Sequence, residues 1–179
     1  MTYYKVTDEH GNAINGGTFT YSLPTETGPG EWTPFIADIE PCATGYHVCD
    51  GAGQLLHWLS TTTLWEAEIK PGDEVVNAGT KTVAHQVRLV KRVATWNGRT
   101  ARLFAADCAE HVLYLFEGKY PDDKRPRQAI QAARDYANGL ISKTALRDAA
   151  YAYAAAYADA YAERTWQTAL LQRYLDGDI

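Results

Sequence analysis

One segment near the C-terminal end restricts the fold more than any other part of the sequence. Residues 149–162 consist of nine alanines, four tyrosines and one aspartate. Alanine is the strongest helix former, so this composition predicts a helix. Ser142 is a suitable N-cap, and the pattern extends to Leu175, which predicts a helix of about 33 residues and roughly 50 Å. A helix of that length must bend, break or protrude from a domain of this size.

Tyrosines form a stripe on this predicted helix. Tyr153, Tyr157 and Tyr161 are four residues apart and therefore lie on one slowly turning side. One interpretation is that the Ala/Tyr helix packs against the helix before it. The other is that the stripe and the nearby Trp166 bind a ligand, a partner or a second copy of the chain. Tyrosine suits binding surfaces because it combines a large ring with a hydrogen-bonding hydroxyl.

The sequence changes character near residue 105. Before that point helix formers are sparse, and short strand signals occur at residues 3–6, 18–21, 45–49 and 64–69. Three prolines and two glycines make residues 24–34 a loop, and Lys81 to Val93 has the pattern of one long strand. Residues 96–99 contain Asn-Gly, which is typical of a turn. We therefore predict an α+β protein with a mostly β module over residues 1–104 and a helical domain over residues 105–179.

Three helices are expected after residue 105. Asp107 can cap the first, which extends to about Glu117. Its apolar positions are Cys108, Val112, Leu115 and Phe116. The second helix follows a polar connection, has Pro126 in its first turn and ends at Asn138-Gly139. The long Ala/Tyr helix is the third.

Charge and composition exclude several classes of protein. The net charge of −5 over 179 residues argues against non-specific binding to nucleic acid, which needs a basic surface. Apolar runs are too short for a membrane helix, and no secretory leader is expected. Three cysteines make a disulfide framework improbable. We therefore expect a cytoplasmic protein.

Five cysteine and histidine side chains could in principle bind zinc. Cys42, His47 and Cys49 lie within eight residues, and Cys108 and His111 form a second pair. Zinc prefers four such ligands, but the paired C-x-x-C hairpins of common zinc ribbons are missing. Buried free cysteine is also ordinary in protein cores. We therefore predict neither a metal nor another cofactor.

A pair of carboxylates gives the sequence its clearest acid–base candidate. Glu66 and Glu68 are two residues apart on a predicted strand, so both point to one side. Such a pair can serve acid–base chemistry, yet a solvated strand face has the same pattern. No dinucleotide-binding, P-loop, serine-hydrolase or zinc-protease motif occurs, so the prediction leans away from an enzyme.

Two resemblances cover most of the chain. The first half resembles small phage and prophage proteins of unknown function, through Tyr4-Lys5-Val6, Gly45-Tyr46-His47-Val48-Cys49 and Glu66-Ala67-Glu68-Ile69. The second half resembles an Ala-rich helical domain of the Imm-5-like immunity-protein type. That resemblance rests on Asp107–Glu110, Pro121–Arg134 and Glu163–Gln167. Together they imply a phage-type protein that acts by binding, and they bring no catalytic residues with them.

The N-terminal order is also similar to that of ADP-ribosyltransferases. That resemblance implies an NAD-using enzyme with Lys5 on its first strand, Tyr46 or His47 on a second, and the Ser60-Thr61-Thr62 stretch. Glu66 or Glu68 would then stabilise the developing positive charge of the ribose. The first strand carries no arginine or histidine where that fold has one.

The function expected from these observations is binding. We expect the chain to sequester or block a host or defence component, either a protein or a small nucleotide-like signal. In the enzyme alternative, Lys5, His47, Glu66 and Glu68 are the catalytic candidates. In a third alternative the chain is a structural or assembly protein that forms a homo-oligomer through its C-terminal helix.

Overall fold

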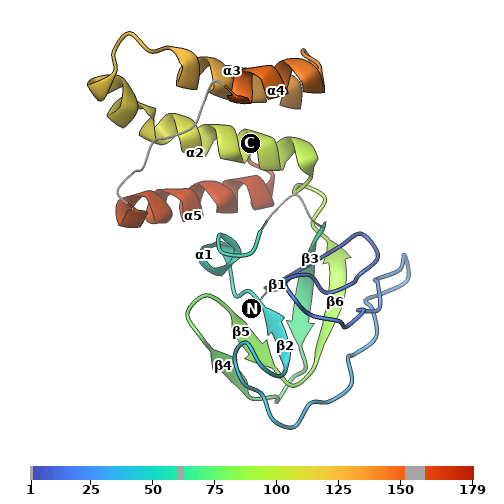
Figure 1. Cartoon of the computed structure of the whole chain (residues 1–179). Coiled ribbons are helices and arrows are strands. Elements are labelled where there is room, and N and C mark those ends of the chain that lie inside the picture. The colour runs from blue at the N-terminus through green and yellow to red at the C-terminus, as the bar shows by residue number, and fades with distance from the viewer. Residues whose placement is uncertain (1, 60–62, 152–159) are drawn as a thin grey trace. The chain divides into compact units, whose positions relative to one another are not determined.

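The computed structural model of the chain consists of two compact units, residues 1–94 and residues 95–179. It describes residues 2–59, 63–151 and 160–179, with side chains over 2–59, 63–147 and 164–179. The first unit holds antiparallel sheets and the second holds helices, so the α+β prediction is confirmed (Figure 1). The units divide between Ala94 and Thr95, whereas the predicted boundary at residue 104 lies inside a helix.

The first unit, called the β unit below, contains two antiparallel sheets of three strands. One has the order β1-β3-β6, formed by Tyr3–Thr7, Thr63–Ile69 and Val87–Arg92. The other has the order β2-β5-β4, formed by Tyr46–Val48, Thr82–Ala84 and Val75–Asn77. A short helix, α1 (Ala52–Leu55), follows β2. Backbone hydrogen bonds in both directions between Tyr4 and Cys49 join β1 to the end of β2.

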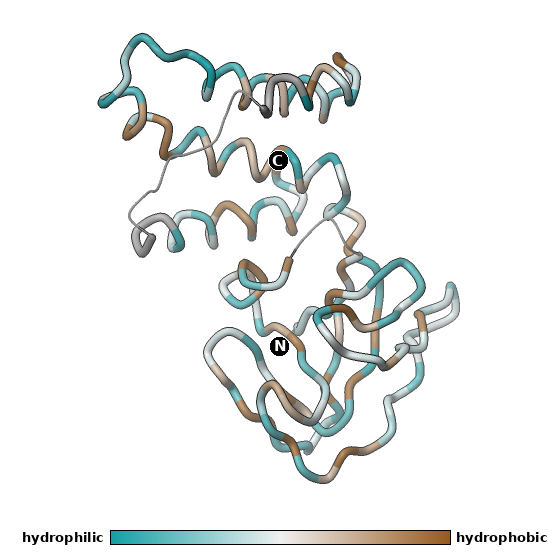
Figure 2. The backbone as a smooth tube through the Cα atoms, viewed as in Figure 1, coloured by the Kyte–Doolittle hydropathy of each residue, from teal (hydrophilic) through white to brown (hydrophobic). Residues whose placement is uncertain are grey.

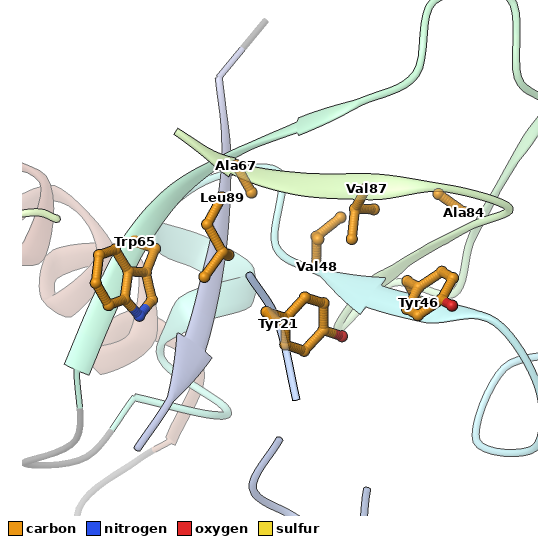
Figure 3. Close-up of a cluster of buried hydrophobic side chains, with 8 residues drawn as sticks. All are labelled: Tyr21, Tyr46, Val48, Trp65, Ala67, Ala84, Val87 and Leu89. Carbon is orange, nitrogen blue, oxygen red and sulfur yellow. The ribbon is translucent and has the colours of Figure 1, made fainter. Parts of the chain in front are cut away.

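Side chains from both sheets form the core of the β unit. Figure 3 shows the rings of Tyr21 and Tyr46 beside Val48, with Val87 and Leu89 of β6 next to them. The rings of Phe19, Tyr21 and Tyr46 meet edge to face, with centroids 5.0 to 6.1 Å apart. Aromatic pairs favour this arrangement, so the three rings stabilise the region where the β1 and β2 strands join.

The predicted long strand from Lys81 to Val93 is wrong, because β5 and β6 belong to different sheets. The chain changes sheet at the two residues between them. The His85 ring Nδ1 lies 2.6 Å from the Ile36 carbonyl oxygen, and the Gln86 side chain donates to the Thr33 carbonyl oxygen at 2.7 Å. Both partners belong to the loop around residues 24–36, which therefore fixes the break. The alternation of residues along the sequence does not reveal this break, because buried residues occur both before and after it.

The second unit, called the helical unit below, contains four described helices. They are α2 (Gly98–Lys119), α3 (Arg125–Ala137), α4 (Lys143–Tyr151) and α5 (Ala160–Asp176). Helix α2 lies in the middle, with α3 and α4 on one side and α5 on the other (Figure 1). The polar connection from α2 to α3 has hydrophilic colours in Figure 2. Pro126 lies in the first turn of α3, as predicted.

Helix α2 begins nine residues before the predicted cap at Asp107. The Asn97 side chain accepts hydrogen bonds from the backbone N–H groups of Arg99 and Thr100, at 2.9 and 3.2 Å. In return the Thr100 hydroxyl accepts from the Asn97 backbone N–H at 2.9 Å. This is a capping box, so the Asn-Gly pair starts a helix where the sequence analysis predicted a turn.

The apolar side of α2 also differs from the prediction. The buried contacts with α3 are made by Ala106 and Leu113, which pack against Ile130. Leu115, expected on the apolar side, is 43% exposed. Small alanines let the two helices approach closely, and a search for large apolar residues overlooks such a face.

The region predicted as one long helix is described as α4 and α5, which have different neighbours. Ser142 caps α4 as predicted, because its hydroxyl accepts from the Ala145 N–H at 3.2 Å. Helix α4 packs on α3, whereas α5 packs on α2. Tyr153 and Tyr157 lie outside the described residues. The backbone of Tyr161 belongs to α5, and its side chain is not among those described.

Candidate functional site

A pocket of about 780 Å³ opens in the β unit next to the junction of β1 and β2. Residues 4–6, 42–49 and the loop 13–19 form most of its wall, and Tyr21, Ile36, Trp58 and Lys81 complete it. Two of the four predicted catalytic candidates, Lys5 and His47, lie in this wall. Among the described residues that line the pocket there is no aspartate or glutamate, although the chain as a whole carries a charge of −5. This contrast makes the pocket the most distinctive site in the β unit.

Lys5 reaches the pocket from the middle of β1. Its Nζ donates a hydrogen bond to the His47 backbone oxygen at 2.8 Å and lies 4.9 Å from the centre of the Tyr21 ring. The β1–β2 junction makes this contact local in space, although 42 positions separate the two residues in sequence. Burial lowers the pKa of Lys5 to about 8, and the nearby Cys49 thiol only partly offsets this effect.

A second lysine, Lys81, also lines the pocket. Lys81 Nζ lies 2.7 Å from Cys42 Sγ and 4.7 Å from the centre of the Trp58 ring. The Trp58 indole donates to the Thr80 carbonyl oxygen at 2.7 Å, which holds the ring in place. Sequence analysis missed Lys81 and Trp58 as site residues, because neither belongs to a recognisable motif. The contact between Lys81 and Cys42 spans 39 positions in sequence.

His47 is held as a neutral hydrogen-bond acceptor. Its Nε2 accepts from the Cys42 backbone N–H at 3.1 Å. Burial, followed by the charges of Lys5 and Lys81, lowers the pKa of His47. The ring is therefore uncharged at neutral pH, and the positive charge of the pocket comes from its lysines.

Cys49 and Cys42 differ sharply in environment, which gives a first prediction. Burial raises the pKa of the Cys49 thiol to about 12, despite the nearby charge of Lys5, whereas Cys42 is exposed beside Lys81. Because the thiolate is the reactive form, iodoacetamide should alkylate Cys42 about 100-fold faster than Cys49. Peptide mass spectrometry over time gives both rates. Comparable rates in the folded protein would contradict the described burial, and Cys42→Ser should remove the fast reaction.

The two other catalytic candidates, Glu66 and Glu68, do not line the pocket. Both form ion pairs across β3 and β6, Glu66 with Lys91 at 3.1 Å and Glu68 with Arg88 at 2.6 Å. Arg88 also lies over the Trp32 ring at 4.5 Å. The structure therefore unites Lys5 and His47 but places both glutamates elsewhere. Residues 60–62 of the transferase-like pattern lie outside the described residues.

These ion pairs give a second prediction. Glu66→Gln and Glu68→Gln should each lower the free energy of unfolding by about 1 kcal/mol or less, because the pairs are partly solvated. The alkylation rate of Cys42 should stay within about twofold of the wild-type rate, since distant sites act independently. Urea unfolding and the alkylation assay test both statements. A large change in Cys42 reactivity would show that the glutamates are coupled to the pocket.

The candidate zinc ligands are divided between the two units. Cys42, His47 and Cys49 line the pocket, whereas Cys108 and His111 lie on α2. Over the described ranges, no group of three or more His, Cys, Asp or Glu side chains is arranged to hold a metal ion.

A second candidate site lies on the helical unit. The His111 ring of α2 stacks on the Trp166 ring of α5, with centroids 3.8 Å apart and planes within 4°. Tyr114 and Leu115 follow one turn further along α2, and they are 66% and 43% exposed. Because positions three and four apart share one side of a helix, the four residues form a continuous patch. We call His111, Tyr114, Leu115 and Trp166 the helical surface.

A charged network ties the two helices that carry this surface, α2 and α5, to α3. Arg134 lies on α3, and its Nη2 atom donates to the carboxylates of Asp107 and Glu110 on α2, at 2.6 Å each. Asp107 also accepts from the Tyr174 hydroxyl of α5 at 2.7 Å. Arg134 lowers the pKa of Glu110 mainly through this hydrogen bond. Asp107, predicted as a helix cap, is therefore the residue at which α2, α3 and α5 are joined.

No helix of the described ranges is both long and apolar enough to cross a membrane.

Comparison with known proteins gives one result, and it concerns the helical unit. No curated protein and no solved structure matches the chain. A family described as "Imm-5 like putative immunity protein" matches residues 92–172, which include α2, α3, α4 and most of α5. The predicted resemblance of the C-terminal part is thus confirmed: over these residues the chain is similar to an immunity-protein-like domain.

Proposed function

We propose that this chain is a binding protein that captures and blocks a partner protein through its helical unit. The observation that carries the proposal is the similarity of residues 92–172 to immunity-protein-like domains. Immunity proteins act by binding, so this class of function needs no catalytic centre in the helical unit. We place the protein in the cytoplasm of a bacterial host, as a phage or prophage product, with a host or defence protein as its target.

The helical surface is the part of this unit that we assign to the partner. Tyr114 and Leu115 offer exposed apolar area, and Trp166 adds a large ring fixed by stacking on His111. Aromatic residues held in place contribute much of the energy of protein interfaces, because little side-chain freedom is lost on binding. Tyr153, Tyr157 and Tyr161 remain candidates for partner binding from the sequence alone.

The test compares two variants of the tagged, full-length protein. Tyr114→Ser combined with Leu115→Ser should abolish co-purification of the partner from host cells, because both anchors become polar. Leu140→Ser is the matched control, since Leu140 is 72% exposed and follows α3. Quantitative mass spectrometry should show one protein enriched with the wild type and the control but not with the double variant. Equal enrichment with all three would overturn the assignment of this surface.

A further inference from the structure

We propose that the pocket of the β unit is a binding site for a small organic phosphate with an aromatic ring, of nucleoside-diphosphate size. The first observation is an unbalanced positive charge. Lys5 and Lys81 both line the pocket, and neither forms an ion pair with a carboxylate in the described part of the chain. Their contacts are a carbonyl oxygen, a cysteine sulfur and two aromatic rings. An ammonium group withdrawn from water, as that of Lys5 is, is stabilised by an opposite charge, and a bound anion would supply one to both lysines.

The environment of Lys5 supports this step. Burial lowers its pKa to about 8, which shows that the folded protein does not fully stabilise the charged form. Lys5 is still mostly protonated near neutral pH, so it is able to attract an anion. A phosphate group beside it would restore the stability of the ammonium form. Lysine binds phosphate in this manner, as a point charge with several donors.

Size and wall chemistry identify the rest of the ligand. A volume of about 780 Å³ is far more than one phosphate requires and is typical of sites for small organic molecules. Phe19, Tyr21, Tyr46 and Trp58 all line the pocket and give it aromatic walls. Aromatic walls stack well on planar rings, and the bases of nucleotides have such rings. Two lysines that can hold a phosphate and aromatic rings that can stack on a base line the same pocket, and together they describe a nucleotide-like ligand.

The glycine-containing loop on one side of the pocket suits this ligand. Gly16 has a φ of +88° and Asn15 a φ of +65°, and nothing lies within 4 Å of the place that a Cβ of Gly16 would occupy. The backbone of this loop is therefore open to a ligand where it borders the pocket. The pocket belongs wholly to the β unit, so this inference does not depend on the partner proposed for the helical unit.

Isothermal titration calorimetry on the full-length protein tests the proposal with ADP, GDP, CDP, UDP, pyrophosphate and adenosine. At least one nucleoside diphosphate should bind with a Kd below about 100 μM, and adenosine at least about tenfold more weakly. If pyrophosphate binds and the protein does not discriminate among the nucleoside diphosphates, the aromatic part of the proposal is overturned. No binding of any diphosphate at about 1 mM would overturn it entirely.

Lysine variants decide whether the binding occurs in this pocket. Lys81→Met should weaken binding of the best diphosphate about tenfold or more, and so should Lys5→Met. Lys91→Met is the control, because Lys91 is exposed and pairs with Glu66 outside the pocket. The Lys91→Met variant should bind the best diphosphate with the affinity of the wild type. If Lys5→Met does not fold, Lys81→Met and Lys91→Met still decide the question, and equal affinity for these two would refute the site.

The pH dependence of binding separates a specific role of Lys5 from general attraction. The titratable groups next to its ammonium are His47, Cys49 and Tyr21. The pKa of His47 is lowered and the pKa values of Cys49 and Tyr21 are raised, so these three side chains stay neutral between pH 7 and 9. Affinity should therefore fall several-fold over this range as Lys5, with its pKa of about 8, loses its proton. Lys5→Met should remove the decrease, and an unchanged decrease in this variant would contradict the role of Lys5.

Discussion

Replacing Gly45 by alanine should lower the free energy of unfolding of the β unit by about 2–5 kcal/mol, through two separate effects. Gly45 has a φ of +101°, a conformation that residues with a Cβ rarely adopt. In addition, a Cβ at this position would lie 2.6 Å from Val83 Cγ1 and 3.0 Å from Ile39 Cγ2. Val83 is fully buried in β5, so it cannot move aside easily. Because Gly45 directly precedes β2, the change also disturbs the strand that carries His47.

Gly72→Ala separates the two effects. Gly72 has a similar φ of +91°, but nothing lies within 4 Å of the place that its Cβ would occupy. This variant should lose only about 1 kcal/mol, the cost of the backbone conformation. Urea unfolding followed by tryptophan fluorescence measures both, since Trp32, Trp58 and Trp65 belong to the β unit. Equal losses of unfolding free energy in the two variants would show that the contact with Val83 does not contribute to the destabilisation.

In the helical unit, Arg134→Met should lower the free energy of unfolding by about 1–3 kcal/mol. The methionine keeps much of the side-chain volume but removes the donor shared by Asp107 and Glu110. Two carboxylates one turn apart on α2 then lose the cation that they share, and Asp107 keeps the hydrogen bond from the Tyr174 hydroxyl. Because Asp107 and Arg134 are only 27% and 24% exposed, water cannot fully replace the lost partner.

Arg127→Met is the matched control for this prediction. Arg127 also joins α3 to α2, through Glu117 at 2.7 Å, but its side chain is 55% exposed. An exposed ion pair contributes little, so the loss should be about 1 kcal/mol or less. Unfolding monitored by the circular dichroism signal of the helices gives the free energy of unfolding of both variants. An Arg127→Met protein that is less stable than Arg134→Met would contradict the account of the charged network.

Local signals in the sequence predicted several elements correctly. The apolar and acidic alternation of Leu64–Ile69 forms β3, and Gly45–Cys49 contains β2. Ser142 and Pro126 mark the starts of α4 and α3, because capping depends on neighbouring residues. Asn97 shows the limit of such signals. The same Asn-Gly pair suits a hairpin turn and a helix start, and only the following Thr100 and the surrounding packing decide between them.

The candidate site was harder to predict, because its geometry depends on distant contacts. Lys5 and His47 were recognised through family resemblance, and the β1–β2 junction places them together. Lys81 and Trp58 carry no local signal, and their place in the pocket follows from the pairing of β2 with β5. Glu66 and Glu68 have the spacing of a catalytic pair, but the register of β3 and β6 gives both of them cationic partners. The charge of a strand face therefore cannot be interpreted without its neighbouring strand.

The most direct test of the proposed function is photocrosslinking in the cells that naturally contain the protein. The photoreactive amino acid p-benzoylphenylalanine replaces Tyr114 in one variant and Leu140 in a control, since both side chains are well exposed. We expect one discrete protein to be crosslinked at position 114 and not at position 140, because the partner covers the helical surface. An adduct of two copies of this 19.8 kDa chain would instead favour the assembly alternative. The absence of any adduct at position 114 would contradict capture of a partner by this surface.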